Sequence, residues 1–457
     1  MATHSTTLNT PVQNPLLTAP ISGLIRKIGV PVGIGAFFNT MFNVVDTYYA
    51  GLISNQALAA LGLSFPIFFV IIALAFGLSS GNTALMGNAL GADDKEGAER
   101  YAVQGMMLGF FLALGLTFAG VAASPFLFGI MGGRGELLPM SLSYINPIFY
   151  GTIFFVMAQM LNAVLNATGK TTYLRNVLVG GFLLNLLLDP WFIRGGLGVP
   201  AMGITGIGLA TTLVQFLGML YLIRPVARSG LISRAGIWRN LIPQPRVVAQ
   251  ILGQGLPNII DMCSISIGFF VLNYFVGRFG QEAIAAFGAA ARIEQLAMLP
   301  LIGLDVATLS LIAQNNGARM IGRVHETFGT SIRYGLLIML VGATTIALLA
   351  NPLMDLFSDD PQVIGIGANY IRIKALGLFP VSFMFVALAA MRGVKRPVDA
   401  LWLSMVRMVI LPLILLPIFI NWLGFGLTSI WWISNVTILL VGVASYLYAK
   451  RLLPAVN

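Results

Sequence analysis

The sequence predicts an all-α polytopic membrane protein, and three observations support this fold class. The chain has 457 residues, of which 57% are hydrophobic and 9% are charged, whereas a soluble domain typically has about 25% charged residues. Apolar runs of roughly 20 residues recur along the whole chain, and each is long enough to cross a ~30 Å hydrocarbon core. The alternating segments of about ten residues that are typical of a membrane β-barrel are absent from the sequence.

The apolar runs predict twelve transmembrane helices in two six-helix lobes. The expected spans are 26–50, 56–88, 100–124, 137–167, 171–193, 203–224, 247–277, 281–315, 324–350, 361–391, 397–421 and 427–450. The remaining segments complete four expected units: a polar, flexible cytoplasmic tail over 1–20, a first lobe over 21–224, an Arg- and Pro-containing cytoplasmic linker over 225–246, and a second lobe over 247–457.

Basic residues are distributed unevenly between the two sets of loops that these spans create. One set holds most of the loop Lys and Arg residues, while the other holds only Arg134, Arg194 and Arg278. Positive charge marks the cytoplasmic side of a membrane protein, so both termini are expected to be cytoplasmic. The net charge of +10 is therefore explained by membrane topology, and no nucleic-acid partner is expected.

The two halves resemble each other at one constant shift along the chain. Pro31 corresponds to Pro257, Tyr144 to Tyr370, and the sequence ALAALG from residue 57 to AIAAFG from residue 283. Because each half has six helices, both halves enter the membrane from the same side. The sequence therefore predicts parallel repeats related by an axis along the membrane normal, which is a transporter architecture.

Two intramembrane acids break this symmetry. Asp46, in the apolar stretch FNVVDTYYAG, corresponds to Leu272, and Asp189, in NLLLDP, corresponds to Leu415. A carboxylate in lipid costs at least ~2.5–3.5 kcal/mol, and the second lobe does without one at either position. The acidic pair therefore indicates a function that was added to one lobe.

Three further polar residues are expected at a depth similar to that of these acids. Asn185 precedes Asp189 by one helical turn and so shares its helix face, and Thr211 and Tyr144 enter the membrane from the outer side. Carboxylate, amide and hydroxyl oxygens suit protons or hard cations such as Na⁺. The alternative is a structural hydrogen-bonded pair that joins the first and fifth helices.

Five sequence motifs taken together resemble the multidrug and toxic compound extrusion (MATE) family over nearly all of residues 20–455. They are Pro31 followed by NVVDT, ALAALGLSFPI, LGADDKEGAER, NAVLNATGKT and NLLLDP. The similarity is greatest to the prokaryotic branch with an acidic amino-terminal lobe. It implies two six-helix lobes around a V-shaped cavity, and export of organic, often cationic, compounds by alternating access against an inward H⁺ or Na⁺ gradient.

The resemblance also implies roles for individual residues. A coupling-ion site (H⁺ or Na⁺) corresponds to Asp46, Asn185, Asp189 and Thr211, and a substrate cavity to Tyr144, Gln159 and Asn162. Pro31, among the glycines of the first helix, suggests a helix that bends when an ion binds, and the alternative is that Pro31 only sets a static kink. No cofactor and no metal other than Na⁺ is expected.

The second half carries its own intramembrane charges, whose role the sequence leaves open. They are Asp261, Arg292 and Glu294 near mid-depth, and Arg372 and Lys374 further out. A buried pairing of either arginine with either acid is one expectation, and it would make these residues structural.

Two other functions compete with the exporter. A lipid-linked precursor flippase of the same superfamily would favour a cavity rich in Arg and Lys, whereas the first lobe here is acidic. A membrane enzyme such as a prenyl transferase would need clustered acids, but Asp93–Asp94 and Asp359–Asp360 are expected on opposite sides of the membrane. We therefore expect a monomeric, non-enzymatic exporter of small organic compounds in the bilayer of a bacterial inner membrane or an archaeal plasma membrane.

Overall fold

The computed structural model describes residues 14–455, and residues 1–13 of the expected tail lie outside this range. The described chain has twelve helices that are long and apolar enough to cross a membrane, which confirms the predicted number. The first lobe contains α2 (Ile21–Ile53), α3 (Asn55–Gly91), α4 (Lys95–Ile130), α5 (Leu137–Ala167), α6 (Thr172–Arg194) and α7 (Ile204–Ala227).

The second lobe repeats this order with more interruptions. It contains α9 (Pro245–Val276), η1 (Gly277–Phe279), α10 (Gln281–Gly317), α11 (Ile321–Leu348), α12 (Ala350–Asp355), α13 (Pro361–Gly393), α14 (Pro397–Met405), η2 (Val406–Ile410), α15 (Leu411–Leu416), η3 (Pro417–Trp422) and α16 (Leu427–Leu452). The segments η2 and η3 are π-helical and lie within a single membrane span.

The internal repeat is visible in the backbone as well as in the sequence. Asp93 and Arg319, which are related by the same constant shift as Pro31 and Pro257, both have a positive φ, of 57° and 56°. Gly169 and Lys395 are related in the same way, with φ values of 71° and 63°. Non-glycine residues with positive φ are uncommon, so these paired turns show that the two lobes reverse the chain in the same manner.

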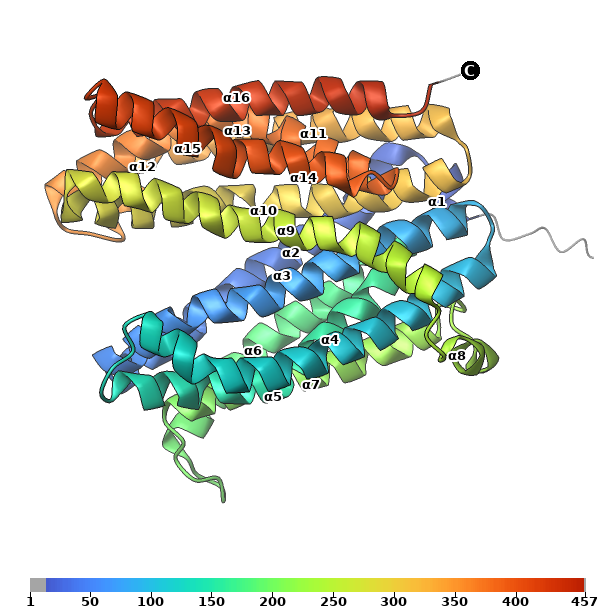
Figure 1. The fold of residues 1–457 in the computed structure, drawn as a ribbon, viewed down its shortest axis with the longest axis horizontal. Coiled ribbons are helices and arrows are strands. Elements are labelled where there is room, and N and C mark those ends of the chain that lie inside the picture. The colour runs from blue at the N-terminus through green and yellow to red at the C-terminus, as the bar shows by residue number, and fades with distance from the viewer. Residues whose placement is uncertain (1–13, 456–457) are drawn as a thin grey trace, which may run out of the picture.

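The two lobes form separate layers that approach each other at one end (Figure 1). α2 packs against α10, and α3 packs against α9 and α10. Small residues make these contacts possible: Gly29 lies against Gly303, and Gly81 lies against Gly255. Close approach through small residues is the usual way in which membrane helices associate. Toward the opposite end, at the left of Figure 1, the ribbons of the two lobes diverge.

Two short helices lie at the end where the lobes meet. α1 (Pro15–Thr18) belongs to the expected tail, and its Leu16 is buried against Gly169 of the first lobe. Next to α1, Arg323 of the second lobe donates a hydrogen bond to the carbonyl of Ala19. This part of the tail therefore has a defined structure that contacts both lobes.

The expected linker contains α8 (Arg234–Asn240), a helix that the sequence did not predict. Glu99 of α4 accepts a hydrogen bond from the backbone of Ser233 at 2.6 Å. The buried Gln104 donates to the carbonyls of Asn240 and Ile242 and accepts from the backbone of Gln244. These bonds fix the linker to the first lobe.

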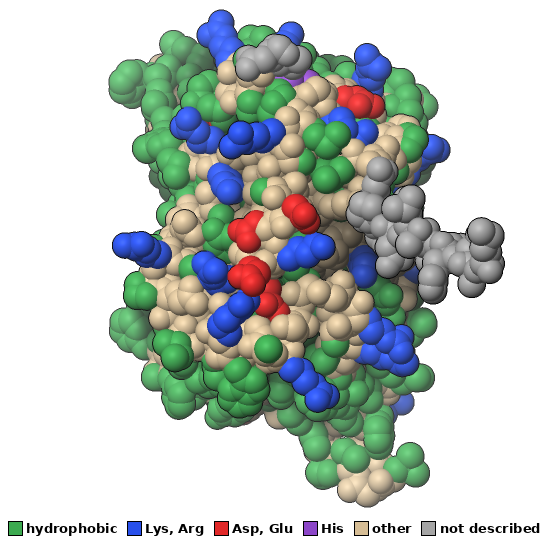
Figure 2. Space-filling model, turned by 90° about the vertical axis from the view of Figure 1, so that its right-hand side faces the viewer, with side chains coloured by type: hydrophobic (Ala, Val, Ile, Leu, Met, Phe, Trp, Pro, Cys, Tyr) green, Lys and Arg blue, Asp and Glu red, His purple; other side chains and the backbone are tan. Residues whose placement is uncertain are grey.

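Figure 2 shows the face at this end of the molecule, where Lys and Arg side chains gather around a smaller group of acids. Exposed basic residues at these helix ends include Lys95, Arg100, Arg239 and Arg246. Arg239 pairs with Glu96 and Glu99, at 3.4 Å in each case. The accumulation of positive charge at one end matches the distribution expected for a cytoplasmic face.

Substituting Gly303 with alanine is expected to destabilise this arrangement of the lobes. An added methyl group would lie 3.0 Å from both the Gly29 carbonyl carbon and the Gly33 nitrogen. Overpacking of this kind costs about 1–3 kcal/mol, so the thermal unfolding midpoint in detergent should fall. Gly288→Ala, in the same helix but with open space around it, should not lower the midpoint, because alanine is a better helix former than glycine. Equal midpoints for both variants would contradict the prediction.

Candidate functional site

Three helices of the first lobe bring four polar side chains together inside the membrane. Asp46 comes from α2, Asn185 and Asp189 from α6, and Thr211 from α7, and all four are buried. Asn185 Nδ2 donates to Asp46 Oδ1 at 2.5 Å and to Asp189 Oδ2 at 3.1 Å. Thr211 Oγ1 donates to Asp46 Oδ2 at 3.4 Å. The predicted cluster therefore assembles around Asp46.

Helical geometry explains why these residues meet. Asn185 and Asp189 are four residues apart, so both side chains leave the same face of α6. Because α2 ends at Ile53 and α6 at Arg194, Asp46 and Asp189 lie about 10 Å and about 7 Å from their helix ends. Similar depths on two adjacent helices allow one amide, Asn185, to contact both carboxylates.

Two oxygen atoms of this cluster have no hydrogen-bond partner. Asn185 Oδ1 and Asp189 Oδ1 are buried and unpaired within the described structure. Buried polar atoms are nearly always satisfied by protein or by ordered water, so unpaired acceptors indicate room for a donor or a cation. Together with the carboxylate oxygens of Asp46, they form a set of ligands suited to a proton or a hard cation.

Tyr144 of α5 packs against α7, the helix that also carries Thr211. It is itself buried, with 6% of its surface exposed. Its carbonyl abuts Gly208 of α7, where a side chain would prevent the close approach of these helices. Tyr144 therefore lies against the helix that brings Thr211 to Asp46.

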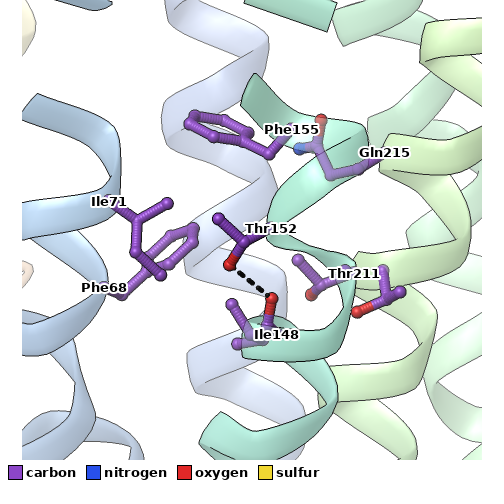
Figure 3. A pocket seen from close by; sticks show the side chains of 9 residues that line it. Phe68, Ile71, Ile148, Thr152, Phe155, Thr211 and Gln215 are labelled. Carbon is purple, nitrogen blue, oxygen red and sulfur yellow. Dashed lines mark hydrogen bonds between the residues drawn. The ribbon is translucent and has the colours of Figure 1, made fainter. Parts of the chain in front are cut away.

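A small cavity of about 10 Å³ lies beside Thr211 (Figure 3). Its lining includes the polar residues Thr152, Thr211 and Gln215 and the aromatic residues Phe68 and Phe155. The hydroxyl of Thr152 is already bonded to the carbonyl of Ile148 at 3.0 Å. The volume is close to that needed for a single water molecule, so Thr211 lies between the acidic cluster and a site of water size.

Gln159 and Asn162 lie apart from this cluster. They follow Tyr144 along α5 by about 22 Å and about 27 Å of helical rise, toward the end where the lobes meet. Both side chains are buried, and each has a carbonyl oxygen without a hydrogen-bond partner among residues 14–455. The expected substrate residues are thus divided between two depths, because α5 runs through the whole lobe.

The second lobe contains an ion pair that differs from the expected one. Lys374 Nζ lies 3.5 Å from Glu294 Oε1 and donates to Ser434 Oγ at 3.1 Å. Tyr370 donates to the other oxygen of Glu294. Neither Arg292 nor Arg372 pairs with Glu294, so the expectation of such a pairing is wrong.

Arg292, Arg372 and Asp261 do not form the buried ion pairs that were expected of them. Arg292 is exposed, because two residues along a helix turn its side chain away from Glu294. Arg372 is exposed and donates to Asn351 at 3.2 Å. Asp261 forms no ion pair within 4.0 Å in the described residues, and Arg392 pairs instead with Asp305.

The sequence analysis missed several polar residues of the second lobe. Asp305 and Arg392 form an ion pair at 2.5 Å, and Arg407 lies in the π-helical segment η2. The spacing of Tyr370 and Lys374 was an available signal, since four residues place both side chains on one helix face, as with Asn185 and Asp189. Arg407 could have been noticed as a lone arginine in an apolar run.

Pro31 lies within α2, which continues through it without interruption. A proline inside a helix removes one backbone donor and disturbs the preceding turn. It lies between Gly29 and Gly33, both of which approach α10 closely at Gly303 and Pro300. The proline is therefore placed where the two lobes meet.

Two six-helix repeats and a buried polar cluster in one of them define a polytopic membrane transporter. The MatE family model matches residues 31–191 and 257–418. The chain therefore belongs to the MATE family, whose members are transporters and not enzymes. The two matched segments begin at Pro31 and Pro257, which are equivalent positions of the internal repeat.

Sequence and structure comparisons with individual transporters are consistent with this family membership. The chain is 26% identical to the FAD transporter of Shewanella oneidensis, over 96% of each chain. It is 28% identical to the probable multidrug resistance protein NorM of Thermotoga maritima, over 81% of this chain and 78% of the relative. A solved MOP superfamily transporter from Pyrococcus furiosus superposes with a TM-score of 0.90 at 28% identity, over 97% of this chain and 98% of the other.

Proposed function

We propose that this protein is a secondary active multidrug exporter that exchanges organic, often cationic, compounds for H⁺ or Na⁺ across a cell membrane. One observation carries the proposal: the buried cluster around Asp46 and Asp189 has two unpaired oxygens and no counterpart in the second lobe. Ionisable residues inside a membrane most often mark ion pathways. The multidrug resistance name of the Thermotoga maritima relative supports organic compounds as substrates.

Each residue of the first lobe has a proposed role. Asp46, Asn185, Asp189 and Thr211 bind the coupling ion. Tyr144 contacts the substrate next to that ion, and Gln159 and Asn162 contact it at another stage of its passage along α5. Competition between ion and substrate for this lobe would couple their movements, because each favours a different conformation.

Alternating access requires the lobes to separate where they now touch. In the proposed cycle, ion binding at Asp46 bends α2 near Pro31, and the outer part of the first lobe then releases its substrate. The close contacts of Gly29 and Gly33 with α10 would transmit this bending to the second lobe.

A dinucleotide is a second candidate substrate. The support is that the Shewanella oneidensis relative, which the chain matches over 96% of both lengths, is named an FAD transporter. A lipid-linked precursor is the remaining alternative. The acidic first lobe would repel its pyrophosphate group, and it would repel the pyrophosphate of a dinucleotide in the same way, so either substrate would have to bind away from Asp46 and Asp189.

The orientation and location follow from the distribution of charge. We place the basic face of Figure 2, with α1 and α8, in the cytoplasm, so that both termini are inside. The membrane is a bacterial inner membrane or an archaeal plasma membrane, and the transporter acts as a monomer. The proposed units are 21–224, the linker 225–246, and 247–457.

Efflux measured in proteoliposomes tests the proposed function. A fluorescent organic cation such as ethidium is loaded, and a pH gradient or a Na⁺ gradient is imposed separately. One of the two inward gradients should drive efflux, and dissipating it with an ionophore should stop the efflux. Equal rates with and without both gradients would overturn ion coupling. No movement of any organic compound under any gradient would overturn export itself.

A further inference from the structure

An open groove of about 520 Å³ lies between α2 and α6 of the first lobe. The residues that line it are Ile34 of α2 and Arg175, Asn176, Val179 and Gly180 of α6. A Cβ atom added at Gly180 would meet no other side chain and no other helix within 4 Å, so the glycine leaves part of the groove open. A groove of this size can hold a small organic group.

Arg175 brings a positive charge to this groove without an acidic partner. Its Nε and Nη2 donate to Asn176 Oδ1 at 3.2 and 2.8 Å, and no acid of residues 14–455 lies within 4.0 Å of its guanidinium nitrogens. Asn176 in turn donates to the hydroxyl of Tyr221 in α7 at 3.1 Å. A guanidinium has five donors and a phenol has one. Most donors of Arg175 and the hydroxyl hydrogen of Tyr221 therefore remain available to an acceptor.

The fold that the two lobes share does not require these polar residues. At the constant shift of the repeat, Arg175, Asn176 and Tyr221 correspond to Leu401, Trp402 and Leu447, and Gly180 corresponds to Val406. The second lobe thus has larger or apolar side chains at all four positions. The open groove and its polar groups therefore indicate a function specific to the first lobe.

Arg175 lies at the boundary between the hydrocarbon and the headgroups of one leaflet. α6 has 23 residues and is about 35 Å long, which is slightly more than the ~30 Å hydrocarbon core of a bilayer. Arg175 lies in the first turn of this helix, about 5 Å from its beginning at Thr172. Just before Thr172, Gly169 contacts α1, so α6 begins at the end of the molecule that carries the basic face of Figure 2.

The surface around the groove is polar at one end and apolar at the other. Lys27 of α2 is exposed and precedes Ile34 by two helical turns, so it lies on the same helix face about 10 Å closer to the basic end. Exposed apolar side chains continue in the opposite direction, at helical spacings of three or four residues from the groove: Phe37 of α2, and Leu183 and Leu187 of α6. A phospholipid in one leaflet has the same polarity.

We propose that this groove binds the headgroup of an anionic phospholipid, with the phosphate at Arg175 and the acyl chains along the apolar side chains of α2 and α6. Basic pockets between transmembrane helices near the positively charged side of a membrane protein bind anionic headgroups in this way. The planar donors of arginine match phosphate oxygens in pairs, and the hydroxyl of Tyr221 supplies a further donor. The proposal does not depend on which compound the transporter exports.

Two lipids with the same acyl chains test the site. Palmitoyl-oleoyl phosphatidylglycerol is anionic, whereas palmitoyl-oleoyl phosphatidylcholine is zwitterionic. Each lipid is titrated into the purified full-length protein in neutral detergent, and native mass spectrometry measures the fraction of protein with one bound lipid. The wild type should prefer phosphatidylglycerol. In Arg175→Gln this preference should fall about fivefold, because one basic residue near the headgroups contributes about that factor to the binding of an anionic lipid.

Arg246→Gln is the matched control for the charge. It removes a positive charge from an exposed position at the same end of the molecule but outside the groove, so its lipid preference should equal that of the wild type.

Gly180→Phe blocks the groove without removing a charge. The open space at Gly180 can receive the ring, so the variant should stay folded, while its binding of phosphatidylglycerol should fall at least as far as in Arg175→Gln. Gly115→Phe adds the same ring at an exposed glycine of α4 that also has open space around it. This control should bind phosphatidylglycerol like the wild type.

Three outcomes would overturn the proposal: equal binding of the two lipids by the wild type, an equal change of preference in Arg175→Gln and Arg246→Gln, or unchanged binding of phosphatidylglycerol by Gly180→Phe. Glycerol phosphate, which has the charged group without acyl chains, distinguishes a lipid from a soluble phosphate compound. At equal concentration it should leave phosphatidylglycerol bound to the wild type. If it displaces the lipid, the groove takes a soluble phosphate and the lipid is the wrong occupant.

Discussion

The Asp46→Asn variant is expected to lose ion-driven efflux almost completely while it remains folded. Asp46 accepts hydrogen bonds from Asn185 and Thr211, and an asparagine side chain can still accept one through its carbonyl oxygen. What the variant loses is the ionisable oxygen that would bind a proton or Na⁺. Because Leu272 occupies the corresponding place in the second lobe, the fold itself does not need a carboxylate there. Gradient-driven efflux from proteoliposomes should fall to the level of protein-free vesicles.

Asp355→Asn is a suitable control, because it makes the same change at an exposed position and should transport normally. Spin labels on α2 and α9 provide a second readout. Their separation should respond to pH or Na⁺ in the wild type but not in Asp46→Asn. Full transport by a well-expressed Asp46→Asn protein would show that Asp46 is not the coupling residue.

Glu294→Gln is expected to reduce the stability of the second lobe strongly. The substitution leaves Lys374 nearly buried without its carboxylate partner and weakens the acceptor of Tyr370. Removing one partner of a buried ion pair costs ~3–5 kcal/mol. The thermal unfolding midpoint of the purified protein should therefore fall clearly.

Two further variants separate this effect from a general loss of charge. Arg292→Gln, on the same helix but exposed and unpaired in the described structure, should change stability by about 0.5 kcal/mol or less. The double variant Glu294→Gln with Lys374→Met should recover much of the stability, because removing both charges leaves neither unpaired. Normal stability of Glu294→Gln together with lost ion dependence would move the coupling site to the second lobe.

The acidic cluster could be predicted well because its evidence is local. Asn185 and Asp189 share a face at a spacing of four residues, and helical rise gives the depth of Asp46. The structure brings these three residues together with Thr211, as expected. By contrast, Gln159 and Asn162 were expected in the cavity of Tyr144, but the same helical rise places them four turns or more further along α5. The substrate-binding role of Gln159 and Asn162 was inferred from the family resemblance and not from their depth in the membrane.

The sequence by itself determined the twelve spans, the two repeats and the helix face of each polar residue, because hydrophobic length and helical periodicity are properties of a continuous segment. Only the tertiary structure decided which charges meet across helices. Glu294 pairs with Lys374 and not with Arg292 or Arg372, and α8 docks on Glu99 and Gln104. Such pairings depend on how helices rotate and cross, which small residues such as Gly303 set at their contacts. The period of one helix contains no information about the rotation of its neighbour.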